Sequence, residues 1–349
     1  MAKENMIPYI YDKSFNRIAE IDDYKSFIWT QRYYTPGDFE LCAPISKLKY
    51  FAIGYYVFRK GDDYGGIIEK VYIGKTEDQS EVVIATGRSL TSILGRRVIS
   101  TQQMITGSVL SGIELLITDN IVNPELPARQ ISNFIFTNTS QSIAEMEAQY
   151  IGENLLDVVS GLCESNQIGM KCKLGSSNNF IFELYDGVDK SYAQSVNPYV
   201  VWSDKYDNLY SSEYFEDCSE FATDVCVGGE VISNERVLVW SAKDSQSGIE
   251  RFEKFLDASS AVSNEQIITQ ETYIKQLQGL GLEEVTEYTT AFTGEIDFSN
   301  VVFGQDIFLG DICTINNEHW GMTLDVRLLE IIESVGEDGT YTVVPTFGE

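Results

Sequence analysis

Hydrophobic and polar residues alternate in short runs through the first part of the chain, a pattern typical of antiparallel strands. Turn residues such as Pro, Gly and Asp separate these runs. The 20 Tyr and 18 Phe of the chain fit this interpretation, because aromatic side chains pack well on a pleated surface. We therefore predict a first sheet domain over residues 1–87. Its predicted strands are Ile7–Tyr11, Lys25–Tyr34, Asp38–Cys42, Gly54–Phe58, Gly66–Ile73 and Glu81–Ala85.

The spacing of apolar residues becomes helical after Gly87. Leu90, Ile93, Leu94 and Val98 recur at helical intervals, and Ser89 precedes them at a position suited to an N-cap. Further helices are predicted over 109–122 and 152–167. These helices predict a helical or mixed α/β middle domain over residues 88–178. The last helix carries an apolar stripe of Leu155, Leu156, Val159, Leu162 and Cys163.

Strand patterns return in the second half and are interrupted by one helix. Ser263 and Gln266 form a capping box for this helix, Ile267, Ile274 and Leu277 give its apolar face, and Gly279 or Gly281 should end it. We predict a second sheet domain over 179–248, completed by later strands, and a helix with a C-terminal β domain over 249–349. The predicted strands are Phe180–Tyr185, Tyr199–Trp202, Asp224–Val227, Arg236–Trp240, Thr293–Phe298, Ile312–Ile315, Thr323–Glu333 and Thr340–Pro345.

The element order β, α, β, α, β indicates an α+β, β-rich protein. At 349 residues with 43% hydrophobic composition, the chain can bury a large core in two or three domains. No sequence repeat of short period is present, which disfavours solenoids and propellers. The N-terminus lacks the pattern of a signal peptide and no long apolar run occurs, so we expect neither conventional secretion nor a membrane span.

Negative charge is concentrated in the second half of the chain. The net charge is −28, of which residues 1–175 contribute −4 and residues 176–349 contribute −24. A strongly anionic surface repels nucleic-acid phosphates, so the chain is not expected to bind DNA electrostatically. The excess can serve solubility alone, or it can form a surface past which another polyanion slides without sticking.

The cysteines do not indicate a metal site. Six cysteines are widely spaced without a Cys-x-x-Cys pair, and His319 is the only histidine that could complete a ligand set. A chain of this length without a signal peptide does not need disulfides. We therefore expect Cys42, Cys163, Cys172, Cys218, Cys226 and Cys313 to be reduced and mostly buried.

Candidate chemical sites are weak. Gly74-Lys75-Thr76 resembles the end of a phosphate-binding loop, but Glu69 stands where the loop needs Gly, and a strand follows where it needs a helix. His319 has several reactive residue types near it in sequence, which could be imagined as a Cys/His or acid/base site. The simpler interpretation is a turn histidine beside Trp320. The neighbours concerned are Asp311, Cys313, Glu318 and Asp325.

Adjacent carboxylates give no support for a glycosidase. Six adjacent acidic pairs occur, fewer than chance expects from 53 acids in 349 positions. No Asp-x-Asx-x-Asx-Gly calcium loop is present either. We therefore predict no catalytic, cofactor-binding or metal-binding residues and no cofactor, and we expect a component of an assembly rather than an enzyme.

Four segments resemble one known family. Tyr33–Pro44, with its aromatic strand, Pro-Gly turn and Phe-Glu-Leu, is similar to the signature of the siphovirus ReqiPepy-type tail protein family. The stretch 87–99, with Gly-Arg-Ser-Leu and Leu-Gly-Arg-Arg, looks like the family's exit from its first sheet domain. Gly152–Val159 looks like its middle helix, and Asp306–Ile315 is similar to its Leu-Gly-Asp strand pattern.

This resemblance implies a phage tail-hub, or baseplate-hub, protein with two tube-like antiparallel β-barrel domains. It further implies a homotrimer at the distal end of the tail tube, in which six similar domains meet a six-fold distal tail ring. The implied partners are that ring, a tape-measure protein, and separately encoded tip, spike, fibre or receptor-binding proteins. The implied location is the distal tail of a virion assembled in the bacterial host cytoplasm. The chain ends at Glu349, shortly after the last family-like strand, so we expect no hydrolase extension.

In this setting DNA would be passing cargo, and acidic residues of the second half would line the channel so that phosphates do not adhere. The alternative is that most of these acids face outside solvent. Three other functions remain open: a carbohydrate-active or carbohydrate-binding tail protein whose aromatic residues stack on sugars, the hub of a tailocin or contractile injection particle without DNA, and the spike base of a secretion system.

Overall fold

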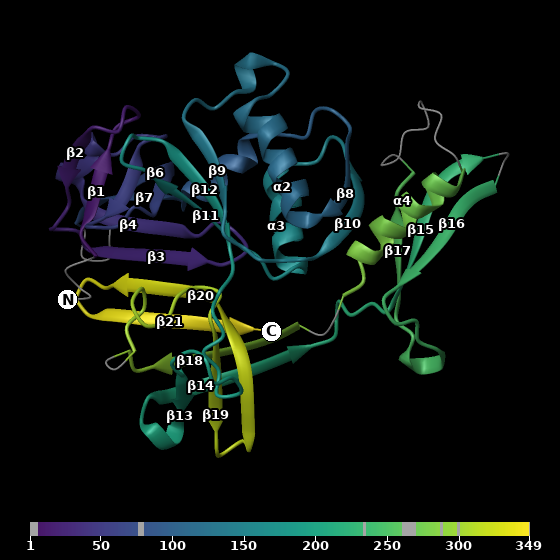
Figure 1. The fold of residues 1–349 in the computed structure, drawn as a ribbon. Helices are drawn as coiled ribbons and strands as arrows, with labels where there is room; N and C mark the ends of the chain where they lie inside the picture. The colour runs from purple at the N-terminus through teal and green to yellow at the C-terminus, as the bar shows by residue number, and fades with distance from the viewer. Residues whose placement is uncertain are drawn as a thin grey trace.

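The structure is a computed structural model that describes residues 6–75, 80–232, 235–259, 270–286, 289–298 and 301–348. The largest sheet among the described residues has 13 strands, and each predicted strand run overlaps a strand (Figure 1). The strands of this sheet are β1 (Pro8–Tyr11), β2 (Arg17–Glu20), β3 (Ser26–Arg32), β4 (Asp38–Pro44), β5 (Tyr56–Arg59), β6 (Gly65–Lys75), β7 (Glu81–Ser89), β13 (Val201–Ser203), β14 (Leu209–Asp217), β18 (Thr289–Ile296), β19 (Ile312–Asn317), β20 (Met322–Val335) and β21 (Tyr341–Gly348).

The large sheet contains one strand arrangement twice. In the first curled unit, which we define as β3, β4, β5, β6 and β7, the strands pair in the order β3-β4-β7-β6-β5. In the second curled unit, β14, β18, β19, β20 and β21 pair in the order β14-β18-β21-β20-β19. All these pairs are antiparallel, and the strands follow one another along the chain in the same sequence. The two units therefore share a topology, and the pairing of β20 with β3 joins them into one sheet.

The repeat extends to the register of the strands. Strand β6 shifts register against β7 between Ile68 and Lys70, and β20 shifts register against β21 between Leu328 and Glu330. Before the shift, β6 pairs with β5, and β20 pairs with β19. A bulge increases the local twist of a strand, so matching bulges give the two units matching curvature.

Each unit curls around apolar side chains. In the first unit Phe27, Trp29 and Leu41 belong to one buried cluster to which β5, β6 and β7 also contribute. The core of the second unit, which includes Phe292 and Phe347, is continuous with that of the middle of the chain. The described strands do not close into a barrel in either unit, so the two tube-like barrels stay a prediction.

The middle of the chain packs helices on two small sheets (Figure 1). Helices α2 (Val109–Ile117) and α3 (Leu155–Ser165) confirm two predictions, and the whole apolar stripe of α3 is buried or nearly so. Asn154 caps α3 by accepting a hydrogen bond from the Leu156 amide at 2.9 Å. The small sheets are β11-β12-β9 and β10-β8, made of β8 (Gln103–Ser108), β9 (Phe134–Asn138), β10 (Glu145–Tyr150), β11 (Gly169–Leu174) and β12 (Phe180–Tyr185).

The helix predicted after Gly87 is wrong in type and length. Leu90–Arg96 forms a 3-10 helix in which Ser89 makes no side-chain cap. Leu90, Ile93 and Leu94 are buried, but Val98 is exposed and lies beyond the helix. A spacing of three residues suits a 3-10 turn as well as an α-helix, so periodicity could not separate the two.

A third sheet, β16-β15-β17, extends from the body with α4 (Gln270–Glu283) on one face (Figure 1). Its strands are β15 (Asp224–Ile232), β16 (Glu235–Ala242) and β17 (Glu253–Asp257). Ser263, Gln266 and Ile267, predicted to begin the helix, lie outside the described residues. The predicted end was wrong, because α4 continues through both glycines. A Cβ at Gly281 would lie 2.5 Å from the Ser241 hydroxyl, so this glycine allows close packing.

The pairings distribute segment 179–248 over three sheets. Strand β12 belongs to the middle of the chain. Strand β14 belongs to the second curled unit, and β13 extends that unit by pairing with β19. Strands β15 and β16 belong to the extending sheet. Strand pairing thus crosses the segment boundaries that the sequence suggested. The four-part domain division remains a proposal.

Candidate assembly interface

The structure does not bring His319 and Cys313 together as a reactive pair. The His319 side chain is 89% exposed, and its Nε2 lies 3.8 Å from the carboxylate of Asp204. Cys313 is fully buried in β19, where burial raises the pKa of its thiol. Lys75 stands at the exposed end of β6, on a strand rather than in a phosphate-binding loop.

Asp311 is buried and forms a structural clamp. Its carboxylate accepts hydrogen bonds from the Val188 amide at 2.8 Å and the Phe308 amide at 3.0 Å, and it pairs with Lys190 Nζ at 2.6 Å. These three donors occupy the carboxylate and link the chain segments before β13 and β19. The geometry indicates a structural role for this residue.

The remaining candidates make separate local contacts. Glu318 pairs with Lys205 at 3.0 Å in an exposed position, and Asp325 accepts a hydrogen bond from Thr314 on the neighbouring strand. Among the described residues, no three His, Cys, Asp or Glu side chains gather in a way that could hold a metal ion. The residues selected from the sequence thus do not form one site.

The contact between the two curled units is the first well-defined interface of the molecule. Six residues of β20, from Glu330 to Val335, lie opposite β3 from Arg32 back to Phe27. Arg32 Nε donates to Glu330 at 2.5 Å, and Arg32 Nη1 donates to Asp38 at 2.6 Å. The junction therefore combines a strand ladder with an ion pair across it.

Strand β20 also contributes Glu333 to a buried charged network. Arg59 is only 8% exposed and pairs with Glu333 and, at 2.6 Å, with Asp62. Glu333 also accepts a hydrogen bond from Tyr341 at 2.7 Å. Burial lowers the pKa of Arg59, but the two carboxylates outweigh this effect and the net pKa is raised. Burial and the charge of Glu333 raise the pKa of the Tyr341 hydroxyl. The network ties the first unit to the β20–β21 hairpin.

Two strand edges of the large sheet carry exposed aromatic side chains. The second half of β6, residues 70–75, pairs with β7 on one side and with no described strand on the other. Strand β14 ends the sheet order and pairs only with β18. Tyr72 on β6 and Phe215 on β14 are 55% and 52% exposed. Large apolar side chains on strand edges are typical of surfaces that another chain covers.

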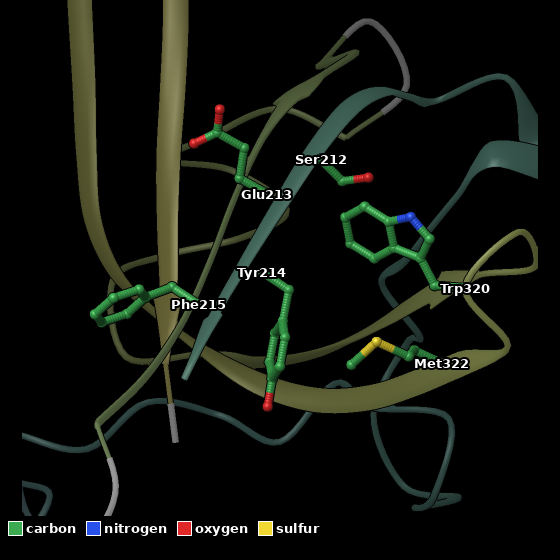
Figure 2. A pocket seen from close by; sticks show the side chains of 6 residues that line it. All are labelled: Ser212, Glu213, Tyr214, Phe215, Trp320 and Met322. Atoms are coloured by element: carbon green, nitrogen blue, oxygen red, sulfur yellow. The ribbon is translucent and has the colours of Figure 1, made fainter. Parts of the chain in front are cut away.

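A shallow groove lies beside β14 (Figure 2). Figure 2 shows Trp320 and Met322 on one side of the strand and Phe215 with Glu213 on the other. Ser212 accepts a hydrogen bond from the Asn317 amide group at 2.9 Å, which holds β14 against the end of β19. The hydrogen bond thus ties the edge strand to β19 of the same unit.

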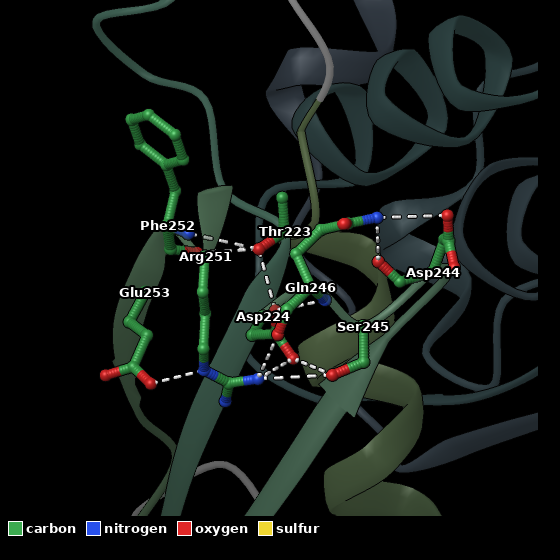
Figure 3. A network of polar contacts seen from close by, with 8 residues as sticks. All are labelled: Thr223, Asp224, Asp244, Ser245, Gln246, Arg251, Phe252 and Glu253. Atoms are coloured by element: carbon green, nitrogen blue, oxygen red, sulfur yellow. Dashed lines mark hydrogen bonds and ion pairs between the residues drawn. The ribbon is translucent and has the colours of Figure 1, made fainter. Parts of the chain in front are cut away.

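The extending sheet carries a polar network at its base (Figure 3). The buried carboxylate of Asp224 accepts hydrogen bonds from Ser245 at 2.6 Å and Thr223 at 2.7 Å, and it pairs with Arg251 at 2.5 Å. The Arg251 guanidinium also lies 4.7 Å from the ring of Trp240. These contacts fix the loop between β16 and β17, and they satisfy the buried carboxylate without a ligand.

Sequence reasoning missed the two strand edges. A signal was present in β6, where Val71, Tyr72 and Ile73 are three consecutive apolar residues. A continuous apolar run is typical of a strand whose two faces are both covered by other parts of the protein or by a partner. The exposed aromatic residue of β14 carried no comparable signal.

The fold is that of phage tail proteins. It is similar to the tail protein from Neisseria meningitidis (TM-score 0.57, 12% identity, 98% of this chain and 96% of that chain). It is similar to prophage tail protein gp18 from Listeria monocytogenes (TM-score 0.54, 12% identity, 98% and 94%). The 43 kDa tail protein of prophage MuSo2 from Shewanella oneidensis is also similar (TM-score 0.53, 12% identity, 98% and 98%).

Residues 7–349 match the profile of the Siphovirus ReqiPepy6 Gp37-like protein family, and the chain belongs to that family. The resemblance inferred from its four segments is thereby confirmed, and the chain is a phage tail protein. No curated protein sequence matches it. Within the described residues, no helix combines the length and apolar character that crossing a bilayer requires.

Proposed function

We propose that this tail protein is a structural tail hub, a homotrimer that closes the distal end of the tail tube. The observation that carries the proposal is the repeated strand topology, since each chain supplies two similar curled units in one continuous sheet. Three chains then present six units, which suits contact with a six-fold ring. The expectation of two tube-like domains is part of this proposal.

In this arrangement the trimer joins the distal tail ring on one side to the tip, spike or fibre proteins on the other. A tape-measure protein occupies the interior before ejection, and DNA passes through afterwards. The charge of −24 in the second half supports a channel that does not bind phosphates. A lumen lined by Lys and Arg would contradict this part of the proposal.

The proposed role does not require catalysis. The candidate residues make structural contacts or remain separate, as described above, and the fold is shared with tail proteins. Incubation with host cell-wall polysaccharide tests this point. No release of sugar is expected, and turnover by the purified chain would support the carbohydrate-active alternative.

Native mass measurement and electron imaging of the purified protein test the trimer. We expect the mass of three chains and a ring with a central opening. A monomer at tens of micromolar would contradict the trimer. Neighbouring genes that encode a capsid would indicate a phage hub. A gene neighbourhood without capsid genes would indicate the hub of a particle that carries no DNA.

A further inference from the structure

We infer that neighbouring copies join through the two exposed strand edges, with residues 70–75 of β6 in one copy lying antiparallel to residues 212–217 of β14 in the next. The register is the one that β20 and β3 already form within each chain. This inference rests on the proposed trimeric ring and identifies the surfaces through which neighbouring chains of that ring contact each other. The occupant of each edge is therefore a second copy of this chain.

The first step is the equivalence of β6 and β20. Counting from the matching bulges, Lys70 of β6 corresponds to Glu330 of β20, because each is the first residue paired after the shift. Their partners, Thr86 and Thr346, then correspond as well. In β20 the six residues after the bulge pair with β3 on one side. In β6 the same six positions have no described strand on that side.

The second step is the equivalence of β14 and β3. Gly87 of β7 and Phe347 of β21 each follow the corresponding threonine by one residue, so they correspond to each other. Phe39 of β4 lies opposite Gly87, and Phe292 of β18 lies opposite Phe347, so the two phenylalanines correspond as well. The partners of these phenylalanines on the edge strands are Trp29 and Tyr214. Arg32 of β3 therefore corresponds to Asp217 of β14, and Thr30 corresponds to Phe215.

The third step transfers the register. The pair Glu330–Arg32 within the chain becomes Lys70–Asp217 between copies. The pair Ile332–Thr30 becomes Tyr72–Phe215. The transferred pairing thus places the two exposed aromatic side chains opposite each other and on the same face, where they cover one another.

Charge supports the same pairing. Residues 70–75 contain Lys70 and Lys75 and no acid, whereas residues 212–217 contain Glu213, Glu216 and Asp217 and no base. Opposite charges across an interface favour association and fix its register. The two strand edges are thus complementary in the sign of their charges, and each carries an exposed aromatic side chain.

The order of units around the ring also follows from charge. Within the chain the cation is on β3 and the carboxylate is on β20, but between copies the cation is on β6 and the carboxylate is on β14. Because β3 and β20 already pair within each chain, two first units could meet only through their free β6 edges, which carry Lys70 and Lys75 and no acid. Two second units could meet only through their β14 edges, which carry Glu213, Glu216 and Asp217 and no base. Both wrong contacts place like charges together, so first and second units must alternate.

Disulfide trapping tests the register. The Tyr72→Cys/Phe215→Cys variant, made with Cys218→Ser to remove the exposed native thiol, should form covalent dimers and trimers on mild oxidation. The matched control is Thr30→Cys/Ile332→Cys, the corresponding pair within one chain, which should stay monomeric on a denaturing gel. Each single-cysteine variant in the same background should give no ladder.

Charge exchange gives an independent readout by mass photometry. Lys70→Glu should raise the dissociation constant about tenfold per interface, and Asp217→Lys should do the same. The double exchange should recover most of the loss, because the ion pair is restored with reversed sign. Lys60→Glu changes the charge equally on an exposed residue outside β6 and should have little effect.

The outcomes separate the two proposals. A native trimer that yields no Tyr72–Phe215 crosslink and ignores Lys70→Glu overturns the pairing but leaves the hub proposal standing. A chain that remains monomeric under the same conditions, with no crosslink, overturns both. A ladder in the cysteine variant, together with recovery in the double exchange, supports the pairing and its register.

Discussion

Replacing Glu333 by Gln tests whether the buried network holds the two curled units together. The substitution keeps the side-chain shape but removes the charge that faces Arg59, which is 8% exposed. Breaking a buried ion pair by removing one partner typically costs roughly 3–5 kcal/mol. Here Asp62 still pairs with Arg59 at 2.6 Å, and an amide oxygen can still accept from Tyr341. We therefore expect a smaller loss, about 2 kcal/mol in the free energy of unfolding.

Urea denaturation followed by tryptophan fluorescence measures this loss, because Trp29 lies 5.5 Å from the Arg59 guanidinium and reports on the junction. Glu337→Gln is the matched control. It makes the same chemical change near the turn after β20, where Glu337 is 70% exposed and pairs with Lys25 at 2.9 Å. An exposed pair contributes little, so the control should lose less than about 1 kcal/mol. Equal losses in the two variants would refute the proposed role of the buried network.

Three further measurements test other parts of the structure. Burial raises the pKa of Glu283, which accepts a hydrogen bond from Tyr150. The stability that Glu283 contributes is therefore fully present below its ordinary pKa and is lost as pH rises through the raised pKa. Glu283→Gln should reduce the fall in melting temperature between pH 4.5 and 7, and an unchanged dependence of melting temperature on pH would contradict this. Asn154→Ala should cost about 1 kcal/mol by removing the α3 cap, measured by denaturation. Mass spectrometry after brief alkylation should find Cys218 modified and Cys163 protected, since burial raises the pKa of Cys163 to about 12; rapid labelling of Cys163 would contradict its burial.

Much of the secondary structure could be predicted, because it depends on local patterns. The apolar stripe of α3 and the alternation in β12 each indicate one element without reference to the rest of the chain. The end of α4 could not be predicted in this way. Gly281 looks like a helix stop in the sequence, but its function is to let the helix approach Ser241.

The repeat of the curled units was not visible in the sequence because it resides in pairing and not in residue identity. Trp29 and Tyr214 occupy corresponding positions, as do Phe39 and Phe292, but neighbouring positions differ in chemistry. The insertion between β14 and β18, which contains the extending sheet and α4, also separates strands that are nearly consecutive in the first unit. The correspondence is visible only in the order and register of the paired strands.

The interface residues could not be predicted for a related reason. Lys70 and Asp217 are ordinary surface charges in the sequence, and each becomes informative only when its counterpart in the junction, Glu330 or Arg32, is known. That counterpart is defined by strand pairing between residues about 300 positions apart. Sequence patterns within one strand contain no information on such distant partners.

Electron imaging of the intact tail at a resolution that separates strands tests the central claim most directly. We predict a ring of three chains at the distal end of the tube, in which first and second curled units alternate and β6 of each chain adjoins β14 of the next. A ring with a different number of chains, or this chain located away from the tube end, would contradict the account.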